Sequence, residues 1–318
     1  MFSYLSEGSR MLIDPFGRPV NNLRISLTQK CNLNCFYCHH EGEGCGSDLR
    51  KKDEMAPEEV AFLVKVAMKL GVRSVKLTGG EPLLYDGIEE VIRRISSING
   101  IHDISMTTNG VLLSKWAQPL AEAGLKRVNV SLDTLSREKY KRITGVDALE
   151  KVIEGVDAAL EAGLRPVKLN MVLLRGINVS DLEEMIEFSR KRKGSILQLI
   201  ELVPGDSRTL EEHRFDPIFI EKMLEDMAAR VVVRKMHRRK KFFLNGGGEV
   251  EVVRPVHNSE FCANCNRMRI TSDGKLKPCL MRNDNLVDVL TPIRQGASEE
   301  EIKRLFIEAV NRRSPYYR

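Results

Sequence analysis

Six short apolar segments, combined with stretches of helical periodicity, constrain the fold of this chain more than any other feature. The segments cover residues 23–28, 74–79, 103–108, 127–133, 166–174 and 196–203. Between them, Pro57 followed by two glutamates is typical of the first turn of a helix, and the apolar stripe that begins at Leu149 ends before Gly163. Strands that alternate with helices predict an α/β fold with a parallel sheet and right-handed crossovers.

Five of these six segments alternate polar and apolar residues. In the first segment, Arg24, Ser26 and Thr28 alternate with leucine and isoleucine, and Lys168 and Asn170 interrupt the fifth segment in the same way. A period of two puts the polar residues on one face, whereas helix-covered parallel strands usually read as nearly continuous apolar runs. A sheet with one solvated face is the alternative, but the intervening helices need the apolar face to pack on. The sequence therefore predicts an open, TIM-like partial (β/α)6 barrel whose polar inner face surrounds a ligand-holding lumen.

The pattern changes after residue 210. Residues 215–233 read as a helix and a strand, residues 238–253 as a basic hairpin and residues 268–280 as a second hairpin with its turn at 272–274. A final helix is expected over 298–311. We therefore expect two domains, a partial barrel over 1–210 and a smaller C-terminal module over 211–318 that closes over it.

Composition limits where the protein acts and what it binds. The chain has 318 residues and seven cysteines, an odd number that does not suit a disulfide framework. Its first residues lack the basic and apolar regions of a secretory signal, and no apolar run approaches the roughly 20 residues that span a bilayer. We expect a cytoplasmic protein with reduced thiols and no membrane partner. The net charge of +6 suits an anionic ligand but does not by itself indicate nucleic acid.

Three thiols follow the first predicted strand directly: Cys31, Cys35 and Cys38. A structural zinc site needs four ligands and usually uses paired C-x2-C motifs, so His39, His40 or Cys45 would have to complete it. The alternative is a four-iron cluster held by three thiolates, which leaves one iron open to a small molecule.

The spacing C-x3-C-x2-C, with Tyr37 before the last cysteine, resembles the motif of the radical S-adenosylmethionine superfamily. The segment "TGGEP" resembles its glycine-rich segment, and the resemblance implies that Gly79, Gly80 and Glu81 meet the methionine part of S-adenosylmethionine. It also implies contacts to this cofactor from Tyr37 and from Ser131 in "NVSLD". Val203 stands near the expected adenine position, where many relatives have methionine.

A second triplet lies in the C-terminal module: Cys262, Cys265 and Cys279. His257 lies nearby, so zinc is again the alternative to a cluster with an open iron. With both triplets, "GGEP", "TTNG", "NVSLD" and "NRMRITSDGK", residues 15–285 resemble the GTP 3′,8-cyclase family of molybdenum cofactor biosynthesis.

The resemblance implies two 4Fe–4S clusters and S-adenosylmethionine as cofactors. A 5′-deoxyadenosyl radical would remove the C3′ hydrogen of GTP, and the ribose carbon would attack C8 to give (8S)-3′,8-cyclo-7,8-dihydroguanosine 5′-triphosphate. The second cluster would hold the purine. Expected partners are a reducing electron donor, a downstream cyclic pyranopterin synthase and a second copy of the chain in a homodimer.

Cationic side chains on the predicted lumen face support a triphosphate independently of the resemblance. They are Arg24, Lys76 and Lys168 on the barrel strands, and Arg267 and Arg269 on a strand after Cys265. Buried cations without anionic partners are costly, and a polyphosphate would pair with them. The alternative is that some form salt bridges with Glu81, Asp133 or Glu201. The resemblance adds Thr107 as a GTP contact.

At position 76 many relatives have arginine. Lysine keeps the positive charge there, but it cannot pair with two oxygens at once as a guanidinium group does.

Two other functions are consistent with parts of the sequence. A radical enzyme that modifies a peptide or protein would also carry an auxiliary cluster, but it would not need five lumen cations. The basic run 234–243 suggests a zinc-stabilised nucleic-acid-binding protein, although such a run is usually a solvated hairpin face.

Overall fold

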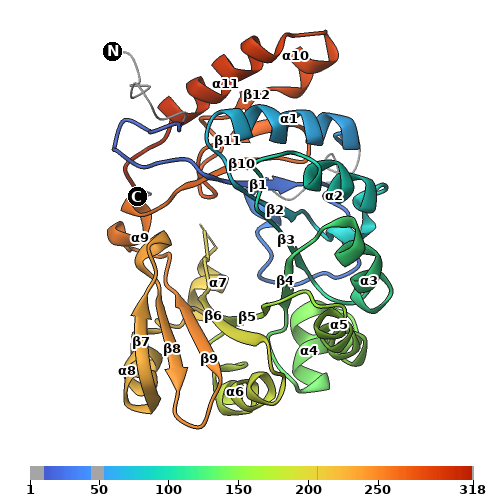
Figure 1. The fold of residues 1–318 in the computed structure, drawn as a ribbon. Helices are drawn as coiled ribbons and strands as arrows, with labels where there is room; N and C mark the ends of the chain where they lie inside the picture. The colour runs from blue at the N-terminus through green and yellow to red at the C-terminus, as the bar shows by residue number, and fades with distance from the viewer. Residues whose placement is uncertain (1–10, 44–53, 206, 317–318) are drawn as a thin grey trace.

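The computed structural model describes residues 11–43, 54–205 and 207–316 (Figure 1). The barrel half contains β1 (Asn22–Ser26), α1 (Pro57–Lys69), β2 (Ser74–Thr78), α2 (Ile88–Ser96), β3 (Asp103–Thr108), α3 (Leu113–Ala123), β4 (Arg127–Ser131), α4 (Arg137–Thr144), α5 (Leu149–Glu161), β5 (Val167–Leu173), α6 (Leu182–Lys191) and β6 (Ser195–Glu201). The C-terminal half contains α7 (Arg208–Glu212), α8 (Ile218–Met227), β7 (Ala228–Val233), β8 (Lys240–Leu244), β9 (Glu249–Val253), α9 (Ser259–Ala263), β10 (Arg267–Ile270), β11 (Lys275–Lys277), β12 (Val287–Asp288), α10 (Leu290–Arg294) and α11 (Glu299–Asn311).

Strands β1 to β6 lie in chain order, and each pairs with the next in parallel. Helices connect the successive strands and lie on the outside of the curved sheet (Figure 1). This arrangement confirms the predicted partial barrel of six strand-helix units. The sequence missed the short elements α7, α9, α10 and β12, which are too brief to show a hydrophobic period.

The C-terminal strands extend both edges of the barrel sheet. Strand β10 pairs in parallel with β1, and β9 pairs in parallel with β6, so that the twelve strands of the described residues form one sheet. The two predicted hairpins are present as β8–β9 and β10–β11. Backbone hydrogen bonds of this sheet join the two expected domains. The domain boundary at residue 210 therefore stays a prediction.

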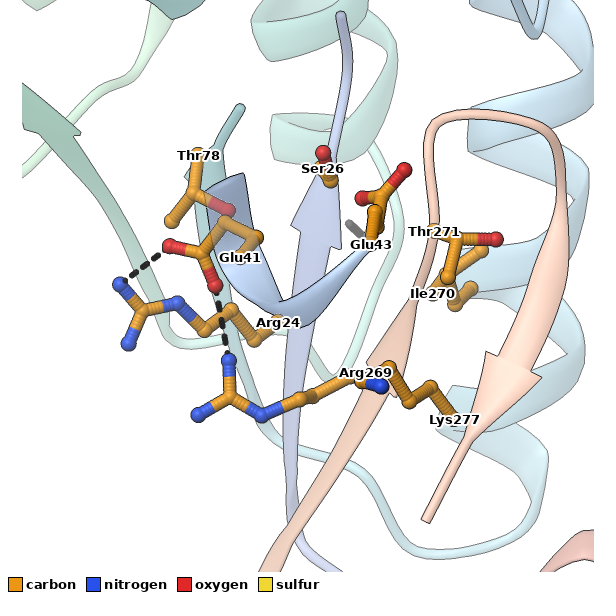
Figure 2. Close-up of a pocket in the computed structure, with 9 residues that line it drawn as sticks. All are labelled: Arg24, Ser26, Glu41, Glu43, Thr78, Arg269, Ile270, Thr271 and Lys277. Atoms are coloured by element: carbon orange, nitrogen blue, oxygen red, sulfur yellow. Dashed lines mark hydrogen bonds and ion pairs between the residues drawn. The ribbon is translucent and has the colours of Figure 1, made fainter. Parts of the chain in front are cut away.

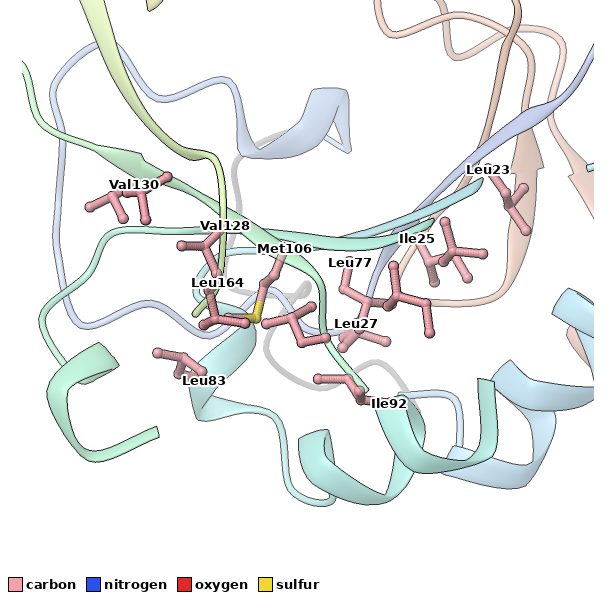
Figure 3. Packing of buried hydrophobic residues seen from close by; sticks show 14 of the residues in the cluster. Leu23, Ile25, Leu27, Leu77, Leu83, Ile92, Met106, Val128, Val130 and Leu164 are labelled. Carbon is pink, nitrogen blue, oxygen red and sulfur yellow. The ribbon is translucent and has the colours of Figure 1, made fainter. Parts of the chain in front are cut away.

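The apolar sides of the barrel strands form the core beneath the helices. Leu23, Ile25 and Leu27 from β1 and the residues after it are fully buried, together with Leu77 and Met106 from the next two strands (Figure 3). Each such side chain contributes roughly 1.5–3 kcal/mol when it is removed from water. The core therefore occupies the face that the alternation assigned to it.

The polar sides of the same strands share the opposite face. In the register of the sheet, Arg24 lies beside Lys76 on one side and Arg269 on the other, and Lys76 lies beside Ser105. Lys168 lies beside Asn129 in the same way. The fold thus gathers cations from both halves of the chain onto one surface.

No helix in the described part of the chain has the length and apolar composition to cross a bilayer.

Helix α11 offers a test of how the C-terminal half is attached. It packs on α1 and on β11 and β12, and Phe306 is only 1% exposed. Replacing Phe306 with Ala should lower the free energy of unfolding by about 3–5 kcal/mol, because it leaves a cavity in the core. Urea denaturation under anaerobic conditions measures the change. Arg304→Ala, on the exposed side of α11, is the matched control, and equal loss in both variants would contradict this packing.

Candidate functional site

The first cysteine triplet lies on the loop that follows β1 at its carboxyl end. Backbone N–H groups point at two of the sulfurs: Leu33 N donates to Cys31 Sγ at 3.5 Å, and His40 N donates to Cys38 Sγ at 3.4 Å. Burial raises the pKa of Cys31 and of Cys35. N–H donors favour thiolates, and burial without a cation opposes them. The three thiols therefore fit a positively charged metal centre, which would supply the missing cation.

The glycines of "TGGEP" lie against the backbone that leads into this loop. Gly80 N donates to Thr28 O at 2.7 Å, and Glu81 N donates to Lys30 O at 2.7 Å. A Cβ atom on Gly80 would lie 2.4 Å from Lys30 O, and one on Gly79 would lie 2.5 Å from Thr28 O. Glycine is required here because the residues after β2 lie against the backbone of residues 28–30, where a side chain has no room. The resemblance implies contact of these glycines with the cofactor, and the structure adds their contact with the backbone of residues 28–30.

Glu81 joins three elements at the carboxyl edge of the sheet. It is fully buried, and its carboxylate accepts hydrogen bonds from Leu83 N, Thr108 Oγ1 and Asn109 N at 3.1, 2.7 and 2.7 Å. Burial outweighs these donors and raises the pKa of Glu81 to about 7. The Asn109 amide reaches Asn32 Oδ1 at 2.7 Å and Cys31 Sγ at 3.8 Å. Glu81 thus connects "TTNG" to the cysteine loop, a role that the sequence did not reveal.

The other residues predicted to contact S-adenosylmethionine also lie at this edge. Tyr37 donates its hydroxyl hydrogen bond to Asp133 Oδ2 at 2.6 Å, and Asp133 Oδ1 accepts from Val172 N at 2.8 Å. Burial raises the pKa of Asp133 to about 6. Ser131 ends β4, and Val203 follows the end of β6; both are partly exposed. The structure brings these residues to one edge, and their contact with a cofactor stays a prediction.

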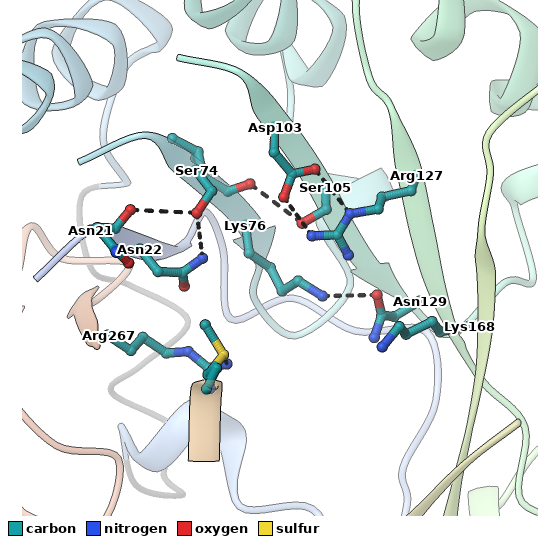
Figure 4. A network of polar contacts seen from close by, with 12 residues as sticks. Asn21, Asn22, Ser74, Lys76, Asp103, Ser105, Arg127, Asn129, Lys168 and Arg267 are labelled. Carbon is teal, nitrogen blue, oxygen red and sulfur yellow. Dashed lines mark hydrogen bonds and ion pairs between the residues drawn. The ribbon is translucent and has the colours of Figure 1, made fainter. Parts of the chain in front are cut away.

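The predicted lumen cations are gathered on the polar face of the sheet; Figure 4 shows Lys76, Lys168 and Arg267, and Figure 2 shows Arg24 and Arg269. Lys76 Nζ donates to Asn129 Oδ1 at 2.8 Å, and Thr107 lies beside Asn129 in the neighbouring strand. Burial, and then Arg24, lowers the pKa of Lys76 well below its usual value. Arg267 has a buried Nε without a hydrogen-bond partner, and burial and Arg24 lower its pKa to about 9. These cations repel one another in the absence of an anion.

Two carboxylates that sequence reasoning missed lie among the cations. Glu41 bridges Arg24 and Arg269, with N–O distances of 3.0 and 2.8 Å (Figure 2). Burial opposes ionisation of Glu41, but these two arginines lower its pKa to about 2. Glu41 lies three residues after Cys38, and that proximity was the only sequence signal for its role.

Glu251 on β9 pairs with cations in the same way at the other end of the polar face. It is fully buried and pairs with Lys168, and with Arg234 and Arg239 at 3.1 Å each. Burial lowers the pKa of Lys168 to about 8, although Glu251 opposes the shift. The positive side chains still outnumber the two carboxylates.

The three acids considered from sequence as partners of these cations are bonded elsewhere. Glu81 and Asp133 accept the hydrogen bonds described above, and Glu201 pairs with Arg214 at 2.9 Å. The alternative of salt bridges was therefore right for Arg24, Arg269 and Lys168, but wrong about the partners.

The loop after the first triplet contacts the hairpin between Cys265 and Cys279. Lys277 Nζ donates to Gly42 O at 3.0 Å, and Ser272 Oγ donates to Glu43 at 2.7 Å. With the Glu41–Arg269 pair, these contacts join the two cysteine regions, which lie more than 200 residues apart in the chain. The pocket between them is lined by side chains from both halves (Figure 2).

The basic run 234–243 is in part the solvated hairpin face that the sequence suggested, since Arg234, Lys235 and Arg238 are exposed, but many of its cations are paired with carboxylates. Besides the two arginines on Glu251, Lys240 pairs with Glu225, Lys241 with Glu249 and Arg238 with Glu260. His237 is buried and stacks on Phe261 with ring centroids 3.8 Å apart. Protein carboxylates thus neutralise much of the charge that a nucleic acid would have bound.

No three His, Cys, Asp or Glu side chains in residues 11–43, 54–205 and 207–316 converge as they would around a single metal ion. In a cubane cluster each thiolate binds a different iron, so a cluster does not require that convergence. Cys45, one of the candidate zinc ligands, lies outside the described residues.

Comparison with known families agrees with this arrangement. The sequence model of the Radical SAM superfamily matches residues 25–189, and that of Molybdenum Cofactor Synthesis C matches residues 195–318. The chain therefore belongs to the radical SAM superfamily, and membership implies a 4Fe–4S cluster and S-adenosylmethionine.

Individual relatives show to which family within the superfamily the chain belongs. A probable GTP 3′,8-cyclase of Thermococcus kodakarensis is 52% identical over 97% of this chain and 100% of its own length. One from Methanocaldococcus jannaschii is 46% identical over 96% of this chain and 99% of its own. At this identity over the full length, the chain is a member of the GTP 3′,8-cyclase family.

Solved structures agree on the fold. Streptococcus suis SuiB bound to S-adenosylmethionine has a TM-score of 0.59 at 18% identity, over 83% of this chain and 60% of SuiB. Native anSMEcpe with bound AdoMet has a TM-score of 0.57 at 18% identity, over 82% of this chain and 74% of its own.

Gly80 provides a test of the contact between β2 and the cysteine loop. Gly80→Ala should displace the backbone of Gln29 and Lys30, because the new Cβ would lie 2.7 and 2.4 Å from their carbonyl oxygens. We expect at least a tenfold loss of S-adenosylmethionine affinity and a lower iron content, measured by equilibrium dialysis and iron analysis. Gly163→Asn is the control, since a side chain there meets open space and Asn tolerates a positive φ. Similar affinities in all three proteins would contradict this role.

Glu81 provides a test of pH dependence. Its pKa is raised from 4.5 to about 7, so its protonation stabilises the fold below pH 4.5, and this contribution is lost as the pH rises through 7. Between pH 5 and 8 the free energy of unfolding of wild type should fall relative to Glu81→Gln by an amount on the order of 3 kcal/mol. Urea denaturation at both pH values measures this difference. The pKa of Asp133 is raised in both proteins, so its contribution cancels from the difference between them. If the difference in free energy of unfolding between wild type and Glu81→Gln is the same at pH 5 and pH 8, Glu81 does not titrate in this window.

Proposed function

We propose that this protein is a GTP 3′,8-cyclase that acts in the first step of molybdenum cofactor biosynthesis and converts GTP to (8S)-3′,8-cyclo-7,8-dihydroguanosine 5′-triphosphate. Full-length relatives support the activity. The assignment of GTP as substrate rests on the buried cations of the lumen face. These positive side chains outnumber the carboxylates that pair with them, and they lie next to both cysteine regions.

Cys31, Cys35 and Cys38 would hold the 4Fe–4S cluster that belongs to the superfamily. When bound, this cluster supplies the electron that cleaves S-adenosylmethionine to a 5′-deoxyadenosyl radical. Tyr37, Gly79, Gly80, Glu81, Ser131 and Val203 form the proposed cofactor contacts. Glu81 holds the "TTNG" turn and the short 3-10 helix η3 (Pro82–Leu84) in place, and Asp133 holds the Tyr37 ring through its hydroxyl.

Cys262, Cys265 and Cys279 would hold a second 4Fe–4S cluster. Two of these thiols come from one turn around α9, and the third follows β11. With three protein thiolates, such a cluster would keep one position free, and the purine of GTP would be held there. The contact between residues 41–43 and β10–β11 keeps the two cysteine regions close to one lumen.

The proposed GTP contacts are Arg24, Lys76, Thr107, Lys168, Arg267 and Arg269. A triphosphate would relieve the repulsion that lowers the pKa of Lys76 and Arg267. Arginine can pair with two phosphate oxygens at once, whereas Lys76 supplies a point charge. These residues bind and orient the nucleotide, and no side chain is assigned as a proton donor or acceptor.

The reductive step requires an external electron donor, and the cyclised nucleotide requires a downstream enzyme that rearranges it, which we propose to be a cyclic pyranopterin synthase. A homodimer and a cytoplasmic location are part of the same proposal.

Anaerobically reduced protein incubated with S-adenosylmethionine and GTP tests the activity. We expect 5′-deoxyadenosine and the 3′,8-cyclised nucleotide in equal amounts, and little of either with ATP. Release of 5′-deoxyadenosine at the same rate without GTP would argue for another substrate, such as a peptide.

Lys168 provides a test of the triphosphate contacts. Lys168→Met keeps the side-chain volume and removes the charge, so GTP affinity should fall roughly 10–100-fold, as expected for a lost charge-assisted hydrogen bond. S-adenosylmethionine affinity should not change. Lys193→Met removes an exposed lysine from the same half of the chain and is the control. Equilibrium dialysis with each ligand measures both affinities, and unchanged GTP binding in Lys168→Met would remove Lys168 from the site.

A further inference from the structure

Residues near both ends of the chain meet at the turn that carries Cys262 and Cys265 (Figure 1). Arg18 Nη1 donates to Cys262 O at 3.0 Å, and Arg313 Nη2 donates to Cys265 O at 2.6 Å. Cys265 N also donates to Cys262 O at 3.1 Å, which closes the turn. Two arginines from opposite ends of the sequence thus hold the main chain of two candidate cluster ligands.

Asp14 fixes both arginines. Its Oδ2 atom lies 2.7 Å from Arg18 Nε and 3.0 Å from Arg313 Nη1, and its Oδ1 atom accepts from Arg18 N at 2.9 Å. The side chains of Asp14, Arg18 and Arg313 are 0%, 7% and 2% exposed. Buried charges are tolerated when they are paired. Asp14 hydrogen-bonds to Arg18 through both carboxylate oxygens, whereas it meets Arg313 as an ion pair, because Arg313 Nη1 makes no hydrogen bond.

The C-terminal segment is bound to the same group. Arg18 Nη2 donates to Ser314 O at 2.6 Å, and Arg18 Nη1 donates to Pro315 O at 3.0 Å. The group therefore ties residues 14–18 and 313–315 to one side of the cysteine turn. We call Asp14, Arg18 and Arg313 the terminal clasp.

The clasp has a net charge of about +1, from two guanidinium groups and one carboxylate, and it contacts the peptide groups of two thiol-bearing residues. Hydrogen bonds and charges around metal ligands orient those ligands and tune the reduction potential of the centre. The function proposed above does not use these three residues.

We propose that the terminal clasp positions Cys262 and Cys265 and makes the reduction potential of the second cluster more positive than it would be without the clasp. This proposal rests on the proposed function, because it assumes that the second triplet holds a cluster. Arg18, Arg313 and Asp14 act through the ligands and are positioning residues.

The test uses the full-length chain with Cys31, Cys35 and Cys38 replaced by Ala, so that only the second triplet can hold iron. The parent should bind about four irons per chain and give the paramagnetic resonance signal of a reduced cluster. In this background, Arg313→Gln should shift the midpoint potential to a more negative value and increase the rate of iron loss to a chelator at least about tenfold. Arg312→Gln removes a charge one residue away, where the side chain pairs with Glu308 on the surface, and should match the parent.

The variant Asp14→Asn distinguishes an effect of the clasp on the cluster from a general loss of protein stability. It removes the negative member of the clasp, so the midpoint potential should shift in the opposite direction, to a more positive value, while iron is again lost faster. A merely structural role would not give opposite shifts. If Arg313→Gln does not fold, as judged by circular dichroism, Asp14→Asn decides the question alone.

The outcomes separate the clasp from the proposed function. A parent that binds no cluster would overturn both the second cluster and the clasp. A parent with a cluster whose potential and iron-loss rate are unchanged by Arg313→Gln and Asp14→Asn would overturn the clasp alone.

Discussion

The rest of the structure depends on the alternation of polar and apolar residues along a parallel sheet. Apolar side chains such as Leu23 and Ile25 are buried under the helices, which leaves the opposite face free to carry Arg24, Lys76 and Lys168. Buried cations repel one another, so this face is stable only with carboxylates or an anionic ligand present. Glu41 and Glu251 provide part of that compensation, and a triphosphate would complete it.

Parallel strands also explain how separate motifs reach one place. All six barrel strands end at the same edge, so the cysteine loop, "TGGEP", "TTNG" and "NVSLD" become neighbours although they lie far apart in sequence. Glu81 fixes this edge by accepting three hydrogen bonds, and the glycines before it let β2 contact the cysteine loop directly. This close packing leaves no room for a side chain at Gly79 or Gly80.

The C-terminal half contributes by extending the sheet at both edges. Strand β10 brings Arg269 next to Arg24, and β9 brings Glu251 next to Lys168. The loop after the first triplet then packs on the β10–β11 hairpin, so the two cysteine regions cannot move independently. The terminal clasp adds the two ends of the chain to this assembly.

The sequence by itself determined the strand-helix order, the polar face and the cysteine and glycine motifs, because each of these is encoded by local spacing or by a period of two. It correctly placed Arg24 and Lys76 on the polar faces of barrel strands, and Arg267 and Arg269 on a strand after Cys265, but it did not predict that this strand pairs with β1. Only the tertiary structure decided that Glu41 and Glu251 neutralise these cations and that Asp14 joins Arg18 to Arg313. Such pairs join residues up to about 300 positions apart, and they form only when the two halves of the chain pack against each other. Local spacing carries no information about that pairing.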